Sequence, residues 1–515
     1  MMVKGLVVAG VIVVGVDAAQ AQTTLTFRQQ MPNITVGVSP AAVATGDFDG
    51  DGKMDMAVAN SDSDDVSILL GNGDGTFTDV GTTFAVDFSP VAIAVGDLNH
   101  DGKPDIVTSN DLGMVLRCVG GPTPSMRCTA DVDCGMDGLC KPSSVNDVSV
   151  LLNQGRTCIG GSSVGNACTK DGDCPGSTCG SLSFAPPMPM PGVTVRDTEV
   201  GNCPEAVVVA DLDGDTIPDV ATADNCDDTV TVLKGVGDGT FTMPQSISVG
   251  SEPMGLATGF IDGDQHLDIV VANMTGGDGG GGTLTVIQGM GGGVFNTQPE
   301  IPIDCGVPDD CLPVAVAIAK LDGDNVADLA VLNLDGSNVT VFLGNGDLTF
   351  RIGSSFPAAT DPESSTAIAA ADFDGDGKTD IATSSVSDNK ISVLLGIGDG
   401  TFGPSQDFDV IGETDLVSPM GIVAADFNMD NHPDLAAASI DDGTVAVFVN
   451  TVGLCLGDCS GDGQVTVDEL VTLASIALGT APISACQSGL QTSEMPITVD
   501  VIVKAVSNAV SGCKP

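Results

Sequence analysis

The sequence contains no tryptophan and no tyrosine, and its aromatic content of 3% comes from phenylalanine alone. Aromatic rings form the stacking platforms that bind sugars and nucleic-acid bases, so the composition argues against such a platform. Basic residues are also scarce, because 17 Lys and Arg stand against 69 Asp and Glu, giving a net charge of −52. Nucleic acids and anionic membranes require a basic surface, so we expect neither as a partner.

Signatures of common catalytic sites are missing as well. The chain has no GxSxG or HExxH motif and no glycine motif that would cradle a phosphate. Its three histidines, His100, His266 and His432, lie in acidic loops away from any serine or cysteine nucleophile motif, and we expect exposed loop residues there. Paired carboxylates are abundant, so acid–base chemistry built from aspartates on loops stays open as an alternative.

Long hydrophobic runs are absent after the N-terminus. Lys4 precedes an apolar run over residues 5–16, and Ala19-Gln20-Ala21 has the small-x-small pattern of a cleavage site. This pattern predicts a signal peptide over residues 1–21 that is cleaved after Ala21, with an uncleaved anchor as the alternative. The run is too short to span a bilayer comfortably. We therefore expect a secreted protein with no membrane span in the mature chain.

Aspartate and glycine, in contrast, recur in one pattern. In Asp47-Phe48-Asp49-Gly50-Asp51-Gly52-Lys53-Met54-Asp55, carboxylates stand at positions 1, 3, 5 and 9. Alternate positions of an extended segment project to one side, and the two glycines allow a tight turn. Converging hard oxygen ligands suit calcium, whereas four such carboxylates without a cation would repel one another. Solvated acidic turns without a metal are the competing interpretation.

Five copies of this loop are complete. Their candidate ligands are Asp47, Asp49, Asp51 and Asp55; Asp97, Asn99, Asp101 and Asp105; Asp211, Asp213, Asp215 and Asp219; Asp372, Asp374, Asp376 and Asp380; and Asp426, Asn428, Asp430 and Asp434. Two further copies have Phe260 or Lys320 at the first position, and for these a metal-free turn is favoured. The ammonium group of Lys320 could take the place of the ion.

The loops begin at residues 47, 97, 211, 260, 320, 372 and 426, so all steps but one lie near 50 residues. A fixed period of this length predicts a repeat architecture. Each unit has four short β-strand patterns separated by Gly/Asp turns, and no helical periodicity precedes residue 460. The sequence therefore predicts an all-β fold, a seven-bladed β-propeller of four-stranded blades. We expect residues 25–36 to close the ring against residues 445–450.

Sixteen cysteines, an even number, fit an oxidising compartment better than thiolate metal sites, because no CxxC pair accompanies them. Eight lie in two related insertions, residues 111–146 and 155–181, that explain the single long step between loops. We expect two disulfides in each insertion, with the pairing left open. Outside them, Cys203 should pair with Cys226 across two antiparallel strands, and Cys305 with Cys311.

The GDFDGDGKxD loops and the GDGTF turns resemble the FG-GAP or VCBS repeats of integrin-type α-subunit propellers and secreted bacterial proteins. The resemblance covers about residues 25–452. It implies that side chains at positions 1, 3, 5 and 9, with a carbonyl at position 7, hold Ca²⁺ between the first two strands of a blade. It implies no single activity, because this scaffold serves many.

The pattern changes after residue 452. Residues 458–469 have the spacing of an EF-hand calcium loop, with Gly463 at position 6. Its candidate ligands are Asp458, Ser460, Asp462, Gln464, Thr466 and Glu469. An apolar stripe predicts a helix after the loop, formed by Val467, Leu470, Val471, Ala474 and Leu478. A second, degenerate copy follows, and the pair resembles a dockerin module in which one calcium loop keeps its ligands and the other has lost them. Four cysteines, Cys455, Cys459, Cys486 and Cys513, fit two disulfides.

These observations divide the chain into a signal peptide (1–21), a propeller (22–453) and a small α-helical EF-hand or dockerin-like domain (454–515). We expect a non-enzymatic extracellular binding or adhesion protein whose ligand is a protein or a polysaccharide. Alternatives are an assembly component whose C-terminal module docks to a cohesin-like partner, and a polysaccharide-acting enzyme. We place the ligand surface on the face opposite the metal loops, around residues 111–146, although both insertions could be surface decoration.

Overall fold

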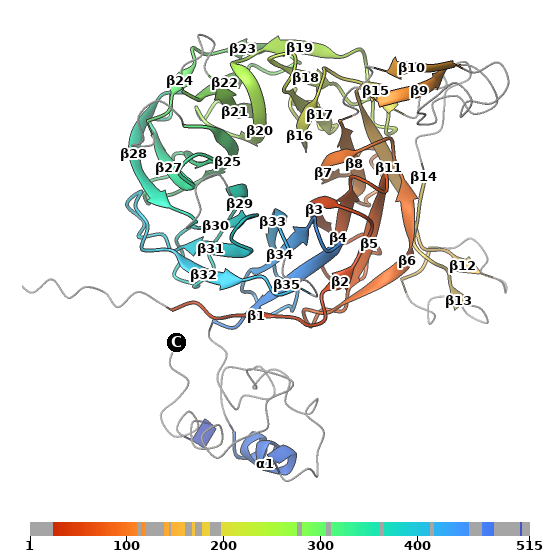
Figure 1. The fold of residues 1–515 in the computed structure, drawn as a ribbon, viewed down its shortest axis with the longest axis vertical. Coiled ribbons are helices and arrows are strands. Elements are labelled where there is room, and N and C mark those ends of the chain that lie inside the picture. Colours follow the sequence, from red (N-terminus) through yellow and green to blue (C-terminus); the bar gives the residue numbers. More distant parts are fainter. Residues whose placement is uncertain are drawn as a thin grey trace, which may run out of the picture.

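In the computed structural model, seven antiparallel β-sheets stand around a central axis as the blades of a propeller (Figure 1). The structure describes residues 24–111, 115–119, 139–143, 146–159, 167–169, 178–185, 197–275, 281–304, 311–359, 365–412, 417–452, 466–477 and 505–506. The all-β, seven-bladed fold predicted from the sequence is confirmed. The predicted signal peptide and most of residues 454–515 lie outside the described residues.

The first four blades each run outward from an inner strand that precedes the acidic loop. Blade 1 contains β3 (Pro40–Gly46), β4 (Asp55–Asn60), β5 (Asp65–Gly71) and β6 (Phe77–Ala85). Blade 2 contains β7 (Pro90–Gly96), β8 (Asp105–Asn110), β11 (Asp147–Gly155) and β14 (Ser183–Ala185), with β15 (Asp197–Glu199) also paired to β11. Blade 3 contains β16 (Pro204–Ala210), β17 (Asp219–Asp224), β18 (Thr229–Leu233) and β19 (Gln245–Ser248). Blade 4 contains β20 (Ser251–Gly259), β21 (Asp268–Thr275), β22 (Thr283–Gly289) and β23 (Phe295–Thr297), with β24 (Ile301–Pro302) paired to β22.

The remaining blades repeat this order. Blade 5 contains β25 (Pro313–Ala319), β26 (Asp328–Asn333), β27 (Asn338–Gly344) and β28 (Phe350–Pro357). Blade 6 contains β29 (Ser365–Ala371), β30 (Asp380–Ser385), β31 (Lys390–Leu394) and β32 (Gln406–Asp409). Blade 7 takes β33 (Pro419–Ala425), β34 (Asp434–Ser439) and β35 (Thr444–Asn450) from the end of the propeller sequence and its outer edge from the beginning.

That outer edge consists of β1 (Phe27–Gln29) and β2 (Ile34–Thr35), both antiparallel to β35. Phe27 lies opposite Asn450, and Ile34 lies opposite Val445. The predicted closure of the ring by residues 25–36 is therefore confirmed. It joins the two ends of the propeller sequence and leaves no unpaired edge on β35.

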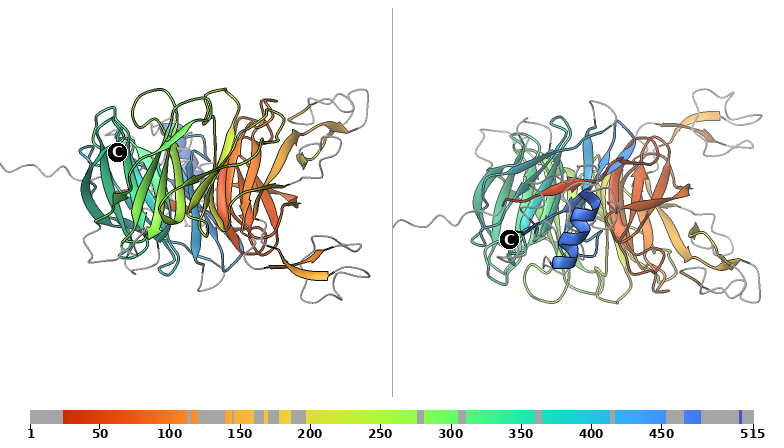
Figure 2. Two further views of the ribbon diagram at one scale, coloured as in Figure 1. Left: turned by 90° about the horizontal axis from the view of Figure 1, so that it is seen from above. Right: turned by 90° about the horizontal axis from the view of Figure 1, so that it is seen from below.

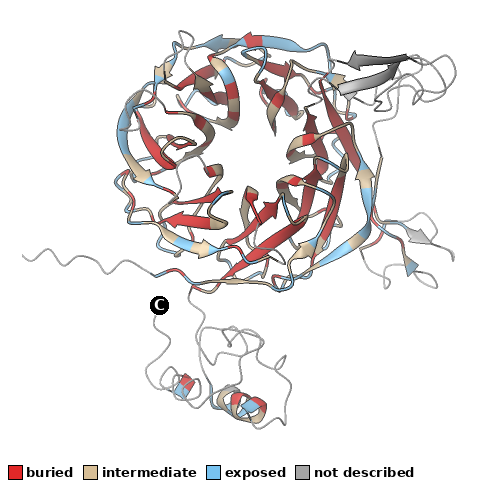
Figure 3. Ribbon diagram, in the orientation of Figure 1, coloured by how far each residue is buried: buried red, intermediate tan, exposed pale blue. Residues whose placement is uncertain are grey.

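Among the described residues, the hydrophobic core of the propeller consists of seven clusters, each formed between two neighbouring blades. The second strand of every blade is buried along its first six residues, because it has a strand on each side and a blade against each face (Figure 3). The apolar residue at position 2 of each acidic loop enters one of these clusters and is at most 3% exposed: Phe48, Leu98, Leu212, Ile261, Leu321, Phe373 and Phe427. The core thus fixes the base of every loop.

The two cysteine-rich insertions both leave blade 2. A hairpin of β9 (Val115–Val119) and β10 (Leu139–Ser143) belongs to the first, and one of β12 (Cys158–Ile159) and β13 (Thr178–Cys179) belongs to the second. Figure 2 shows that these hairpins project from opposite faces of the ring. This arrangement follows from topology, because the first interrupts the connection between β8 and β11 and the second that between β11 and β14.

Two disulfides are present among the described residues. Cys203 and Cys226 are bonded, with 5.4 Å between their Cα atoms, as predicted from their places at the ends of adjacent strands. Cys168 and Cys179 are bonded within the second insertion, a pairing that the sequence left open. Cys311 is also disulfide-bonded, while its predicted partner at position 305 lies outside the described residues.

The described part of the C-terminal module is mainly α1 (Val467–Ala477). A helix is present where one was predicted, but the predicted apolar stripe is only partly buried, since Leu470 and Ala474 are half-buried. Val467 and Val471 are 74% and 58% exposed, whereas Leu473 and Ile476, three residues apart, are buried. The buried face is thus rotated from the predicted one, because contacts outside the helix decide which of its apolar residues are covered. No helix in the described part of the chain is long and apolar enough to cross a membrane.

A buried carboxylate at the end of β17 gives a prediction about stability. Asp224 accepts hydrogen bonds from the hydroxyls of Thr229 and Thr231, and burial raises its pKa to about 6. The matching residue of blade 4 is Asn273, which donates to Thr283 and Thr285. Between pH 4 and 6 the folded protein therefore holds a proton that the unfolded chain has lost, so Asp224 becomes destabilising as pH rises.

We expect Asp224→Asn to raise the free energy of unfolding by about 1–3 kcal/mol at pH 8 and to leave it nearly unchanged at pH 4. Urea unfolding at both pH values measures the difference. The reverse substitution in blade 4, Asn273→Asp, is the matched control and should destabilise the protein at pH 8 more than at pH 4. Equal effects of Asp224→Asn at the two pH values would contradict the prediction.

Candidate cation sites

The carboxylate at position 9 fastens each acidic loop to its blade. In blade 1, Asp55 accepts a hydrogen bond from the backbone N–H of Phe48 at position 2 and another from Gly71 at the end of β5, both at 2.8 Å. All seven blades repeat these two bonds, at 2.7–3.0 Å. The position-9 residue therefore joins the loop to the third strand in the incomplete loops as well as in the complete ones.

Burial places these carboxyl groups in an environment that disfavours their charge. It raises the pKa of Asp55, Asp105 and Asp380 to about 7 and that of Asp434 to about 8, while the two backbone donors oppose the shift. A neighbouring divalent cation would favour the ionised form instead. The position-9 residues thus have a structural role, and a bound cation would hold them in their ionised form.

Three of the complete loops bring three carboxylates together. In blades 1, 3 and 6, oxygens of the residues at positions 1, 3 and 9 all lie within 4.8 Å of one another. The groups are Asp47, Asp49 and Asp55; Asp211, Asp213 and Asp219; and Asp372, Asp374 and Asp380. Hard oxygen donors at this spacing fit a cation such as Ca²⁺. Gly50 and Gly52 have φ values of 76° and 85°, so the turn around the blade 1 group uses backbone conformations that favour glycine.

The predicted ligand at position 5 does not belong to these three-carboxylate groups. Asp51 forms an ion pair with Lys53 at 2.6 Å, and Asp376 does the same with Lys378. Position 1 accepts backbone hydrogen bonds, since Asp47 receives them from Gly50, Asp51 and Gly52. Position 5 thus lies outside the three-carboxylate groups.

The loops of blades 2 and 7 have an amide at position 3, Asn99 and Asn428, and so present fewer carboxylates. In the two incomplete loops the position-3 carboxylate has a neighbouring donor: Gln288 donates to Asp262 at 2.8 Å, and Arg351 lies 3.7 Å from Asp322. The ammonium of Lys320 contacts Asn325 at 3.5 Å. Among the described residues, Arg351 therefore forms the ion pair with this loop's position-3 aspartate, whereas Lys320, which could have taken the place of the ion, contacts Asn325.

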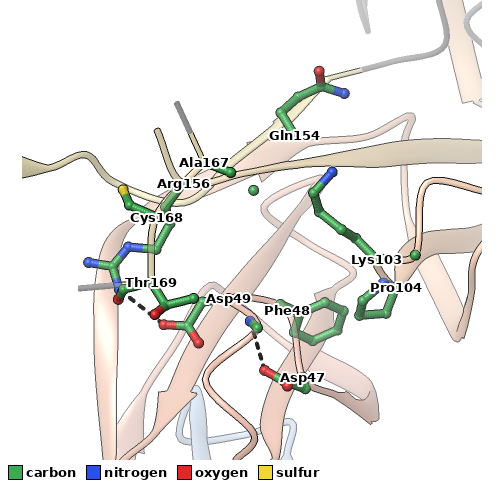
Figure 4. Close-up of a pocket in the computed structure, with 13 residues that line it drawn as sticks. Asp47, Phe48, Asp49, Lys103, Pro104, Gln154, Arg156, Ala167, Cys168 and Thr169 are labelled. Atoms are coloured by element: carbon green, nitrogen blue, oxygen red, sulfur yellow. Dashed lines mark hydrogen bonds and ion pairs between the residues drawn. The ribbon is translucent and has the colours of Figure 1, made fainter. Parts of the chain in front are cut away.

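Protein cations also contact position 3 in two of the three-carboxylate groups. In blade 3, Lys234 bonds both Asp213 and Asp215. In blade 1, Arg156 from the second insertion contacts Asp49 at 3.0 Å (Figure 4). The position-3 carboxylate is therefore already paired with a cation of the protein in blades 1 and 3.

Sequence analysis missed both cations. Alignment of the seven units would have revealed Lys234, because the matching position holds an apolar residue in five other blades: Leu70, Leu152, Leu343, Leu395 and Val449. Arg156 has no equivalent in the other units. The histidines do lie in the loops, but only His100 is exposed, and His266 and His432 are half-buried. In the EF-hand loop, only the end near Thr466 is described, so its predicted ligands remain predictions.

Three stretches of the chain match the FG-GAP-like repeat family: residues 47–108, 211–271 and 320–383. Each match begins at the first position of an acidic loop, in blades 1, 3 and 5, and ends in the second strand of the following blade. Together they cover less than half of the chain. No curated protein matches the sequence.

Solved structures similar to this chain include BBS1N in complex with ARL6DN, with 14% identity, 82% of this chain and 96% of that chain covered, and a TM-score of 0.47. Virginiamycin B lyase from Staphylococcus aureus has 11% identity, 83% and 99% coverage, and a TM-score of 0.46. An Agrocybe aegerita lectin that recognises non-reducing terminal N-acetylglucosamine has 18% identity, 79% and 87% coverage, and a TM-score of 0.41. These similarities are too weak to indicate a shared function. The chain is thus a seven-bladed β-propeller that contains FG-GAP-like repeats.

Proposed function

We propose that this protein is a secreted calcium-binding propeller that acts as a non-enzymatic binding or adhesion protein. The observation that carries the proposal is the recurrence of three converging carboxylates at equivalent places in blades 1, 3 and 6. In blade 6, Asp372, Asp374 and Asp380 would hold Ca²⁺, with the carbonyl at position 7 as a further ligand. The ion would neutralise the carboxylates and stiffen the loop between the first two strands.

Secretion is supported by the disulfides, which persist in oxidising compartments. Cys203–Cys226 fastens the start of β16 to the turn after β17, and Cys168–Cys179 closes part of the second insertion. The N-terminal pattern of residues 1–21 agrees with this proposal. A cohesin-like partner for residues 454–515 belongs to the same proposal as a separate docking activity.

The binding role is supported by the architecture. Seven blades packed through buried interfaces form a rigid ring, and long loops on a rigid scaffold are where binding residues concentrate. The β9–β10 hairpin of the first insertion projects from the face opposite the β12–β13 hairpin (Figure 2). It interrupts the connection between the second and third strands of blade 2, and the acidic loops connect first and second strands, so topology places it opposite those loops. We propose that this face contacts an extracellular protein or polysaccharide.

The function can be tested by capturing ligands from the native extracellular medium with the full-length mature chain, with and without a calcium chelator. We expect a ligand that is retained with calcium and is lost when residues 111–146 are replaced by a short Gly/Ser turn. The matched control is the same replacement of residues 160–177 in the second insertion, which should leave capture unchanged. Capture that survives the first replacement would contradict the proposed ligand surface.

A further inference from the structure

We infer that the second cysteine-rich insertion acts as a cap on the blade 1 cation loop. By holding Arg156 against Asp49, it lowers the affinity of this loop for a cation. The inference rests on the proposed calcium binding and goes beyond it, because it predicts unequal sites in loops of nearly identical sequence. Blade 1 has DFDGDGKMD and blade 6 has DFDGDGKTD, so the two loops differ only at Met54 and Thr379.

The guanidinium group of Arg156 is held by the insertion itself. Its Nε donates to the carbonyl of Gly180 at 3.0 Å, and Nη1 donates to the carbonyl of Thr169 at 3.1 Å and to Asp49 at 3.0 Å. Thr169 and Gly180 directly follow the two cysteines of the Cys168–Cys179 disulfide. The disulfide therefore lies beside both carbonyls that orient the arginine.

The insertion also lies against the loop itself. A methyl group added at Gly50 would come within 3.7 Å of the Thr169 side chain. One surface pocket is lined by both parts, including Asp47, Asp49, Arg156 and Thr169 (Figure 4). The cap and the candidate ligands therefore share one surface, and the Asp49 side chain is only 6% exposed beneath it.

Blade 6 provides the comparison. Lys378 pairs with Asp376 at 2.6 Å, as Lys53 pairs with Asp51 in blade 1. Among the described residues, no basic side chain forms an ion pair with Asp374, the counterpart of Asp49. The two sites therefore share their carboxylates and their position-7 lysine, and they differ at position 3, where only Asp49 is paired with a guanidinium group. The neighbours of the position-4 glycine differ as well, with Thr169 beside Gly50 and His432 beside Gly375.

That difference acts on cation affinity through two effects. A divalent ion that enters blade 1 must share or displace the ion pair on Asp49, and it must also lie close to a positive charge that carbonyls hold in place. In blade 6, the described residues place no such ion pair and no such fixed positive charge at position 3. Lys234 acts in the same way in blade 3, where it pairs with two of the loop's carboxylates.

The absence of tryptophan and tyrosine allows each site to be measured separately. In full-length mature protein, Met54→Trp places the chain's sole tryptophan at position 8 of the blade 1 loop, and Thr379→Trp places it in blade 6. These substitutions also make each reporter loop read DFDGDGKWD. Tryptophan-sensitised Tb³⁺ luminescence, competed by Ca²⁺, then reports one loop at a time.

We expect the blade 6 reporter to titrate with Tb³⁺ at a concentration roughly five- to thirtyfold lower than the blade 1 reporter. Adding Arg156→Gln should tighten binding in the blade 1 reporter by the same factor and leave the blade 6 reporter unchanged. Replacing both Cys168 and Cys179 by Ala should tighten blade 1 in part, because the carbonyls that orient Arg156 are released. Thermal melting checks that each variant is folded.

Two different failures can be told apart. If both reporters titrated at the same Tb³⁺ concentration and Arg156→Gln had no effect, the role of the insertion as a cap would be overturned. The proposed calcium binding would not be affected by this result. A blade 6 reporter without Ca²⁺-sensitive luminescence would instead overturn the proposed calcium binding. A disulfide variant that binds Tb³⁺ as weakly as the unmodified blade 1 reporter would overturn the role given to the disulfide in holding Arg156.

Discussion

Removal of calcium should lower the melting temperature of this protein strongly. An ion that binds only the folded state adds roughly 2.7 kcal/mol per site when its free concentration is a hundredfold above Kd. We predict five ions in the propeller and one in the EF-hand loop, with the strongest stabilisation in blade 6. The measurement is thermal melting with calcium and with EDTA, combined with metal analysis of the purified protein.

Asp372→Asn provides the control for this experiment, because it removes a first-position ligand from the blade 6 loop without a change in side-chain size. It should reduce the bound calcium by one equivalent and make melting less sensitive to EDTA. Magnesium should replace calcium poorly, since it requires a tighter octahedral site. A purified protein without calcium, and with the same melting temperature in EDTA, would refute the prediction.

Loss of a position-9 carboxylate should destabilise the fold even where no cation binds. Blade 4 allows this test, because Phe260 replaces the first ligand of its loop. Asp268 accepts buried hydrogen bonds from the backbone N–H groups of Ile261 and Gly289, each at 3.0 Å. Asp268→Ala leaves both donors without this acceptor, so we expect a loss of about 2–5 kcal/mol in the free energy of unfolding.

Urea unfolding with and without calcium measures this loss, which should be the same in both conditions. Asp268→Asn keeps one acceptor oxygen and should lose about half as much. Asp264→Ala, at the exposed position 5 of the same loop, is the matched control and should change stability by less than about 0.5 kcal/mol. If Asp268→Ala proved no worse than Asp264→Ala, the structural role of position 9 would be wrong.

Much of the fold was determined by the sequence alone, because it depends on a local pattern repeated at a fixed period. The acidic loops mark the turn between the first two strands of each blade, and four strand patterns per period require a radial arrangement to cover their edges. Blade 7 lacks a fourth strand after residues 445–450, and residues 25–36 have strand character but no blade of their own, so closure was predicted for the same reason. Cys203 and Cys226 could be paired because antiparallel neighbours bring strand ends together.

Only the tertiary structure decided which charges meet at the loops. Arg156 is 107 residues from Asp49, and no local pattern relates them. The contact arises because neighbouring blades pack side by side, which places the blade 2 insertion over the blade 1 loop. The double hydrogen bonding of Asp55 likewise needs Gly71, which the third strand supplies only after the sheet forms. A sequence repeat sets local geometry, whereas the neighbours of a given side chain depend on packing between units that are far apart in the chain.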